Sequence, residues 1–230
     1  MQMQGKYRHE LKYAIGKADY LAIRSRIRTV MKPDSHADAN GLYTIRSIYF
    51  DNADDKALRE KMDGAARREK FRIRYYNDDF SFITLEKKMK HNNLCMKLDA
   101  VLTERECKNI LSGNTAHLQG HPNALVRELI SKMNTQQLRP RVLVSYVREP
   151  YIYEAGNVRV TFDSEIRTSL FHREFLEQNV HDISATNTSG DMILEVKFDE
   201  YLPDIISCLI QTEGIRQQAF SKYGACRRFG

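Results

Sequence analysis

Two arginines lie two positions apart in the segment KFRIRYY, residues 70–76. Because successive side chains of a β-strand point to opposite faces, Arg72 and Arg74 share one face and the apolar residues between them share the other. A guanidinium group is always protonated in proteins and binds carboxylate or phosphate oxygens through paired N–H donors. The segment therefore predicts a strand that directs two permanent positive charges at one anionic group.

The same alternation of charged and apolar residues recurs in other segments. Charged faces are formed by Arg8, Glu10 and Lys12; Glu86, Lys88 and Lys90; Lys97 and Asp99; Arg159, Thr161 and Asp163; and Glu195 and Lys197. An open antiparallel sheet usually exposes its polar face to water, and this is one interpretation of the pattern. These polar faces are almost entirely charged, however, which favours a second interpretation in which they line an interior.

Eight segments have the periodicity of strands, and helical patterns fill the intervals between them. The expected strands are residues 6–14, 42–50, 69–77, 80–90, 94–102, 140–149, 157–163 and 191–198. The expected helices lie at 20–30, 57–62, 103–111, 123–133, 203–213 and 219–229. Such a mixture belongs to the α+β class, and eight antiparallel strands can close into a barrel. The sequence thus predicts an eight-stranded antiparallel β tunnel, a closed barrel with a charged lumen and helices packed outside.

The composition fits a single domain over residues 1–230, since 42% of the 230 residues are hydrophobic and no linker divides the chain. The formal net charge of +6 favours an anionic partner. The four cysteines and seven histidines show no zinc-binding spacing, and no signal peptide or membrane span is recognisable. We therefore expect a cytoplasmic protein with reduced cysteines and no membrane span in this chain.

Nine short motifs, taken together, resemble the catalytic polyphosphate polymerase domain of the vacuolar transporter chaperone (VTC) family. In chain order they are HELKY (9–13), SIYFDN (47–52), KFRIRYY (70–76), ITLEKK (83–88), MKLDA (96–100), SYVREPY (145–151), VRVTFD (158–163), ILEVKF (193–198) and AFSKYG (219–224). Each motif alone is weak, whereas nine in this order are specific. The family is part of the triphosphate tunnel metalloenzyme superfamily. The resemblance therefore implies an eight-stranded tunnel, transfer of the ATP γ-phosphoryl group onto a polyphosphate chain, and a divalent cation, Mn²⁺ or Mg²⁺.

The resemblance also implies roles for individual side chains. Those implied to act on the transferred phosphoryl group are Lys12, Arg72, Arg74 and Lys222. Those implied to bind other phosphates are Arg59, Lys88, Lys97, Arg148, Arg159 and Ser221. The divalent cation is assigned to Glu195 with help from Glu10, and Glu86 is expected to orient arginines. Such cations would neutralise the charge that spreads over phosphoryl oxygens, and an ionised phosphate acceptor requires no general base.

The chain departs at two points from the superfamily that it resembles. Many members begin with the pattern E-x-E-x-K, but here Arg8 stands in the place of the first acid, before Glu10 and Lys12. The loss of that acid argues against the two-metal triphosphatase and cyclase branches. Eukaryotic relatives also carry a phosphate-sensing domain and membrane spans that this sequence does not show. We therefore do not expect coupled export or attached sensing, and a membrane partner protein stays an open question.

Three classes of function are compatible with these residues. The first is a polyphosphate polymerase, with ATP, polyphosphate, and inorganic phosphate or pyrophosphate as its partners. The second is a metal-dependent hydrolase of triphosphate or polyphosphate that uses water as the acceptor. The third is a non-catalytic module that binds a polyanion, although no nucleic acid is expected. Glu195 argues against the third class, because an acid in a basic site weakens anion binding unless a cation bridges the two.

Overall fold

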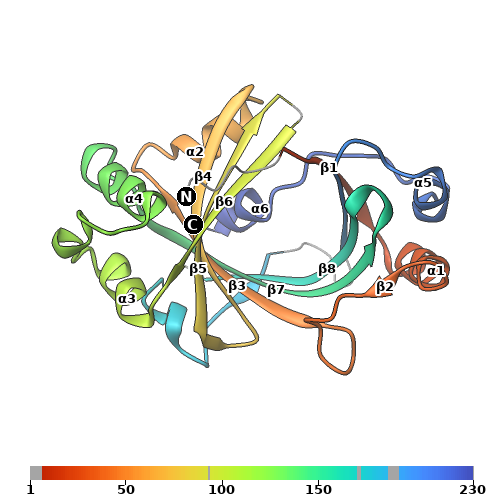
Figure 1. Ribbon diagram of the computed structural model, residues 1–230, viewed down its shortest axis with the longest axis horizontal. Coiled ribbons are helices and arrows are strands. Elements are labelled where there is room, and N and C mark those ends of the chain that lie inside the picture. Colours follow the sequence, from red (N-terminus) through yellow and green to blue (C-terminus); the bar gives the residue numbers. More distant parts are fainter. Residues whose placement is uncertain (1–6, 93, 170–171, 186–191, 230) are drawn as a thin grey trace.

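The computed structural model describes residues 7–92, 94–169, 172–185 and 192–229. Its centre is a strongly curved antiparallel sheet (Figure 1). The eight main strands are β1 (His9–Ile15), β3 (Tyr43–Asp51), β4 (Arg67–Tyr76), β5 (Asp79–His91), β6 (Leu94–Leu102), β7 (Arg139–Tyr153), β8 (Val158–Ser169) and β10 (Met192–Phe198). All eight predicted strands are confirmed, although positions 6 and 191 of the predicted ranges lie outside the described residues.

The prediction of a closed eight-stranded barrel is wrong. Over the ranges that the structure describes, the sheet has ten strands, because β2 (Lys32–Pro33) pairs with β7 and β9 (Ile183–Ser184) pairs with β8. The main path runs β1-β10-β8-β7-β3-β4-β5-β6, and among the described residues no ladder joins its two end strands. These strands meet at one isolated bridge, between Arg8 and Cys95.

Side chains occupy the gap between β1 and β6. The carboxylate of Glu10 on β1 accepts hydrogen bonds from Lys88 Nζ at 2.6 and 2.8 Å, and from Cys95 Sγ at 3.5 Å. Closure of a barrel requires a matched stagger of all its strands. Here the contacts beyond the Arg8–Cys95 bridge are made by side chains: Glu10 of β1 accepts from Cys95 of β6 and forms its ion pair with Lys88 of the adjacent strand β5.

The helices are α1 (Lys17–Ile27), α2 (Lys56–Met62), α3 (Glu104–Ser112), α4 (Ala124–Thr135), α5 (Asp204–Ile210) and α6 (Lys222–Cys226). Short 3-10 turns are η1 (Ala116–Leu118), η2 (Ala155–Asn157), η3 (His172–Leu176) and η4 (Arg227–Phe229). Every predicted helix is present, but the last two are shorter than expected. No helix in the described ranges combines the length and the apolar character that a membrane crossing requires.

Two apolar clusters on the outer faces of the sheet explain the alternating strand pattern. One contains Phe71, Ile73 and Leu85 and packs against α3 and α4. The other contains Val160 and Leu194 and packs against α1 and α5. The two helix pairs lie at opposite ends of the molecule in Figure 1. The α+β class and the outer position of these helices are therefore confirmed, and the charged faces are left for the inside of the curve.

The short C-terminal helix α6 packs on the inner side of the sheet. Its Tyr223 stacks on Tyr49 of β3 with ring centroids 5.2 Å apart, in a third apolar cluster that includes inner residues of β3 and β7. The Tyr223 hydroxyl also donates to the buried carboxylate of Asp51 at 2.6 Å. Asp51 in turn accepts from the backbone N–H groups of Ala57 and Leu58 at the start of α2. The Asp51 carboxylate therefore connects α2 to α6 on the inner side of the sheet.

Candidate functional site

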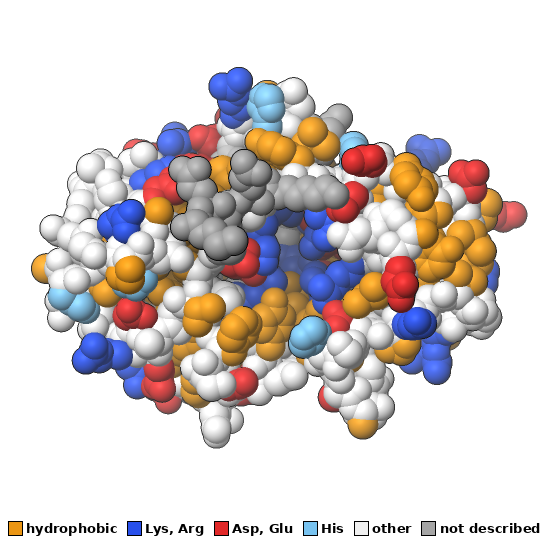
Figure 2. All heavy atoms as spheres, viewed as in Figure 1, with side chains coloured by type: hydrophobic (Ala, Val, Ile, Leu, Met, Phe, Trp, Pro, Cys, Tyr) orange, Lys and Arg blue, Asp and Glu red, His pale blue; other side chains and the backbone are white. Residues whose placement is uncertain are grey.

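The charged faces of the strands surround a cavity of about 310 Å³. Figure 2 shows Lys and Arg side chains gathered in a central hollow of the molecule. The cations that line this cavity, which we call the central pocket, are Lys12, Lys61, Arg68, Lys70, Lys88 and Lys90. They come from β1, α2, β4 and β5, and the segment 217–221 completes the wall. The curved sheet thus concentrates positive charge where a small anion can enter.

Arg72 and Arg74 of β4 converge on one buried carboxylate. Arg72 Nε donates to Glu86 Oε2 at 2.6 Å, and Arg74 Nη1 lies 3.7 Å from Glu86 Oε1. Although burial opposes ionisation of Glu86, the two arginines and Lys97 hold the pKa of its carboxyl far below its usual value. Glu86 lies directly opposite Arg72 in the β4–β5 ladder, so the sheet register itself makes this contact. The contacts fit the expected role of Glu86 as the residue that orients the arginines.

A second buried carboxylate, Asp163 of β8, joins two more of the implied phosphate ligands. Arg148 of β7 grips it with two hydrogen bonds, of 2.6 Å from Nε and 2.7 Å from Nη2. Lys222 Nζ of α6 forms an ion pair with the same carboxylate and lies 4.6 Å from the ring centroid of Tyr146. Sequence reasoning placed Asp163 on a charged face but assigned it no role. Its role as a shared anchor required the β7–β8 register and the docking of α6.

Glu195 of β10 is surrounded by three cations. Lys197 Nζ lies 2.7 Å from its Oε1, Arg148 Nη2 lies 3.6 Å from its Oε2, and Lys12 Nζ lies 3.9 Å from its Oε2. Although burial opposes its ionisation, Lys197 and Lys12 hold the pKa of the Glu195 carboxyl well below its usual value. Glu195 is opposite Lys12 in the β1–β10 ladder. It is therefore a carboxylate, and never a neutral acid, near neutral pH.

Glu10 is the second acid of this group. Burial opposes its ionisation, but Lys12 and Lys88 lower the pKa of its carboxyl to about 2, while the charge of Glu195 acts in the other direction. Within the described residues no three carboxylate, His or Cys side chains converge on one point. Mg²⁺ and similar hard cations are commonly held by one or two carboxylates together with substrate phosphates and water. Glu10 and Glu195 are oxygen donors in their charged form, and they fit a cation bound in this way.

The other residues that the family resemblance assigns to phosphate binding lie at separate places in the structure. Ser221 lines the central pocket and its hydroxyl caps α6 by accepting from the N–H of Gly224. Arg159 lies elsewhere, where it pairs with Asp34 and donates to Tyr43 Oη at 2.7 Å. Arg59 is exposed on α2 and does not line the central pocket.

Several lining cations received no role from the sequence. Lys90 is on the charged face predicted with Glu86 and Lys88 but received no role, whereas Lys70 precedes Arg72 by two residues, so strand periodicity alone could have placed it on a charged face too. Lys61 lies on a helix, where the pattern carried no such signal. The position of Lys61 in the pocket depends on how α2 docks.

Lys70 gives the pocket a pH dependence near neutrality. Burial lowers the pKa of its ammonium group, Tyr49 raises it, and Lys88, Lys12 and Arg72 lower it; the net result is a pKa of about 8. A lysine with a lowered pKa loses its charge as the pH rises through that value. We therefore expect the affinity for inorganic tripolyphosphate to decrease between pH 7 and pH 9, measured by calorimetry in chelator. The decrease should be smaller in Lys70→Arg, whose guanidinium stays protonated; an identical pH profile would contradict the assignment.

Comparison with known proteins agrees with this geometry. The model of the VTC domain family matches residues 7–229. A putative adenylyl cyclase from Hippeastrum, described as having a dominant triphosphatase activity, shares the fold with a TM-score of 0.57 and 11% identity, over 98% of this chain and 96% of that one. A putative adenylate cyclase from Bacillus halodurans has a TM-score of 0.52 and 16% identity, over 85% of this chain and 82% of that one.

No curated protein matches the sequence significantly. The two structural matches are below 20% identity and concern the fold alone. The family match, in contrast, extends over nearly the whole chain, from the first described strand to the C-terminal helix. This protein belongs to the VTC domain family and has the fold of the triphosphate tunnel metalloenzymes.

Proposed function

We propose that the protein is a polyphosphate polymerase that moves the γ-phosphoryl group of ATP onto a polyphosphate chain. The observation that carries this proposal is the pair of ionised acids Glu10 and Glu195, which both form ion pairs with Lys12; Glu10 also lines the central pocket among its cations. Acids in this position oppose the binding of a bare polyanion. They would instead hold a divalent cation, Mn²⁺ or Mg²⁺, which would supply positive charge to neutralise the phosphates.

Three groups of charged residues on the inner side of the sheet would take part in phosphoryl transfer. Lys12 contacts both acids and would place its ammonium group on the transferred phosphoryl oxygens. Arg72 and Arg74, aimed by Glu86, would grip the phosphates of one substrate. Lys222 is held at the lumen by Asp163 and would neutralise charge on the leaving group. A bound divalent cation would add further neutralisation of phosphate charge.

The same phosphate-binding residues would serve a hydrolase of triphosphate or polyphosphate, in which water is the acceptor. Arg8 favours the transferase, since it replaces an acid that the two-metal branches use and forms an ion pair with Asp199 at 2.9 Å. A passive polyanion-binding module is the third alternative. The acids Glu10 and Glu195 argue against it, because they would only weaken metal-free binding.

Incubation of the purified protein with ATP and Mn²⁺ tests these alternatives directly. We expect a ladder of polyphosphate chains on a gel and formation of ADP without an equal release of inorganic phosphate. Chelator should abolish both products, because the acids then lack their bridging cation. Release of inorganic phosphate without chains would identify a hydrolase, and the absence of turnover with any divalent metal would identify a binding module.

A further inference from the structure

The two ends of the curved sheet meet along a line between β1 and β6, at Arg8 and Cys95, which we call the seam. The backbone N–H of Arg8 donates to the carbonyl oxygen of Cys95 at 2.9 Å, and the N–H of Cys95 donates to that of Arg8 at 3.0 Å. Because this bridge is antiparallel and lies close to the start of both strands, β1 and β6 leave it in opposite directions. Among the described residues, every junction along the main path is a ladder, whereas the seam is a single bridge.

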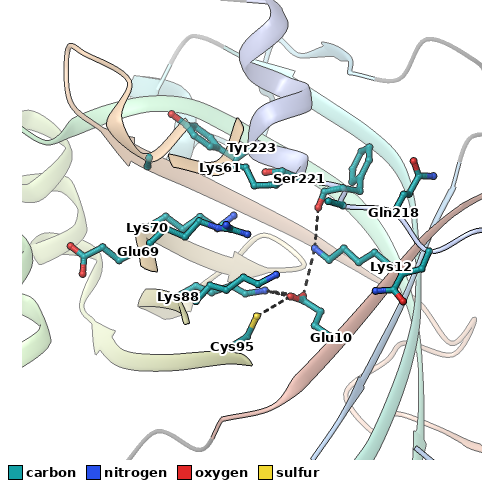
Figure 3. Close-up of a pocket in the computed structure, with 16 residues that line it drawn as sticks. Glu10, Lys12, Lys61, Glu69, Lys70, Lys88, Cys95, Gln218, Ser221 and Tyr223 are labelled. Atoms are coloured by element: carbon teal, nitrogen blue, oxygen red, sulfur yellow. Dashed lines mark hydrogen bonds and ion pairs between the residues drawn. The ribbon is translucent and has the colours of Figure 1, made fainter. Parts of the chain in front are cut away.

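The inner side of the seam is part of the wall of the central pocket. Glu10, Lys88 and Cys95 line that pocket together. In Figure 3 the Glu10 carboxylate lies between Lys12 on one side and Lys88 and Cys95 on the other, with dashed lines to all three. The ion pair of Glu10 with Lys88, at 2.6 Å, links β1 to β5 across the seam through side chains alone. Separation of the seam would therefore open the central pocket sideways without disrupting a ladder.

The strands on the two sides of the seam belong to halves that are packed separately. One apolar cluster packs β4, β5 and β6 against α3 and α4, and another packs β1, β8 and β10 against α1 and α5. The side chain of Arg8 belongs to the second half, since its Nε lies 2.9 Å from Asp199, just beyond β10, and its Nη2 donates to the backbone oxygen of Asn157 at 2.5 Å. Each half would therefore keep its own apolar core if the seam opened.

The long strand β7 connects the two halves. Its residue Leu143 packs in the first cluster and its residue Tyr151 packs in the second. The β7–β8 register shifts between Ser145 and Val147, which lie between those two residues, and the β3–β7 register also shifts, late in β3. An irregularity of this kind bends a strand and changes its local twist. β7 therefore offers a hinge on the side of the sheet away from the seam.

The short helix α6 and the segment before it occupy part of the lumen. In Figure 1, α6 lies inside the ring of strands. It is fixed there, because Tyr223 stacks on Tyr49 and Lys222 forms an ion pair with Asp163. The segment 217–221 also lines the central pocket. Entry through the seam would spare a long polymer from threading one of its ends past these elements.

We propose that the seam is a lateral gate, which opens when the two halves part about β7 and admits an internal segment of a long linear polyanion to the central pocket. Opening breaks two backbone hydrogen bonds and the contacts of Glu10 with Lys88 and Cys95, whereas parting the sheet at another junction of the main path would break a ladder. The identity of the polymer as polyphosphate rests on the proposed polymerase function. The opening of the seam does not depend on it.

The natural Cys95 allows the gate to be locked by one substitution. The Cα atoms of a hydrogen-bonded antiparallel pair are about 5.5 Å apart, a separation that a disulfide can span. Arg8→Cys should therefore form a disulfide with Cys95 under oxidation and lose it under reduction. Cys208 is exposed and is replaced by Ser in every protein of the test. If a thiol count shows no disulfide, Tyr7→Cys/Met96→Cys, the next pair in the same register, provides a second lock.

The control is Thr84→Cys/Val101→Cys, at directly opposite positions of the β5–β6 ladder, where a disulfide does not cross the seam. Stopped-flow measurements would follow the association of a long inorganic polyphosphate and of the same polymer with a bulky group on each end. The wild type should bind both at similar rates. We expect oxidation to slow the association of the end-blocked polymer at least about tenfold in the seam variant and to leave it unchanged in the control. Tripolyphosphate, which can enter through the hollow of Figure 2, should bind the oxidised and the reduced seam variant equally.

Equal association of the end-blocked polymer with the oxidised and the reduced seam variant would overturn the gate. A wild type that does not bind the end-blocked polymer would overturn it too. Hydrogen exchange tests the seam without any ligand: the amides of Arg8 and Cys95 should exchange at least about tenfold faster than those of Ile73 and Leu85, a pair within the β4–β5 ladder. Equal protection of the two pairs would contradict the opening. If the wild type makes no polymer from ATP but oxidation still excludes the end-blocked polymer, the polymerase proposal fails and the gate stands.

Discussion

Replacement of both Arg72 and Arg74 by alanine is expected to abolish phosphoryl transfer. Each arginine can make charge-assisted hydrogen bonds to phosphate that are worth roughly 1.5–3 kcal/mol, so the loss of both should weaken substrate binding by several orders of magnitude. Binding of ATP and of tripolyphosphate would be measured by calorimetry, and turnover by the gel assay with Mn²⁺. Unchanged affinity in a folded double variant would show that the arginines only compensate Glu86.

The structure calls for a control in this experiment, because the alanines leave Glu86 buried without two of its partners. A buried carboxylate that loses its partners destabilises a protein strongly. The triple variant Arg72→Ala/Arg74→Ala/Glu86→Gln removes that charge and should restore the unfolding temperature without restoring turnover. Glu86→Gln alone keeps both cations and should reduce turnover less than the double variant. Recovery of activity in the triple variant would show that the defect was one of folding.

Glu195→Gln is expected to lower turnover at least about a hundredfold, because an amide keeps the shape of the side chain but not the charge that a hard cation requires. Metal-free polyphosphate should bind equally well or more tightly, since a repelling charge has gone and Lys12, Lys197 and Arg148 are released from it. Activity with Mn²⁺ and polyphosphate affinity in chelator would be compared in the wild type and the variant. Opposite changes in the two quantities separate an enzyme from a passive binder.

Glu200→Gln is a matched control for this prediction. Glu200 lies two residues beyond the end of β10 and is exposed, and the substitution is chemically identical. We expect its activity and its polyphosphate affinity to equal those of the wild type. Full activity of Glu195→Gln in the presence of Mn²⁺ would disprove the assignment of Glu195 as a metal ligand.

Strand periodicity was sufficient for the fold class and for all eight main strands, because one face of each strand must be apolar to bury against the helices. The charged segments that contain Arg72 and Arg74 or Glu195 and Lys197 were recognisable for the same reason. Closure of the sheet was not predictable in this way. It depends on the stagger between β1 and β6, the first and last strands of the main path, which meet at a single backbone bridge within the described residues.

The sequence by itself determined which residue types face the tunnel, since the alternation of side chains is a local property of the backbone. Only the tertiary structure decided which cations are compensated. Asp163 joins Arg148 and Lys222, which are 15 and 59 residues away along the chain, because β7, β8 and α6 meet there. Within the described part of the chain, Lys61 and Lys70 form no ion pair, because the neighbouring acid Glu69 pairs with Lys87 and Lys132 instead. Electrostatic pairing depends on distances of a few ångströms between segments distant in sequence, and these distances exist only after folding.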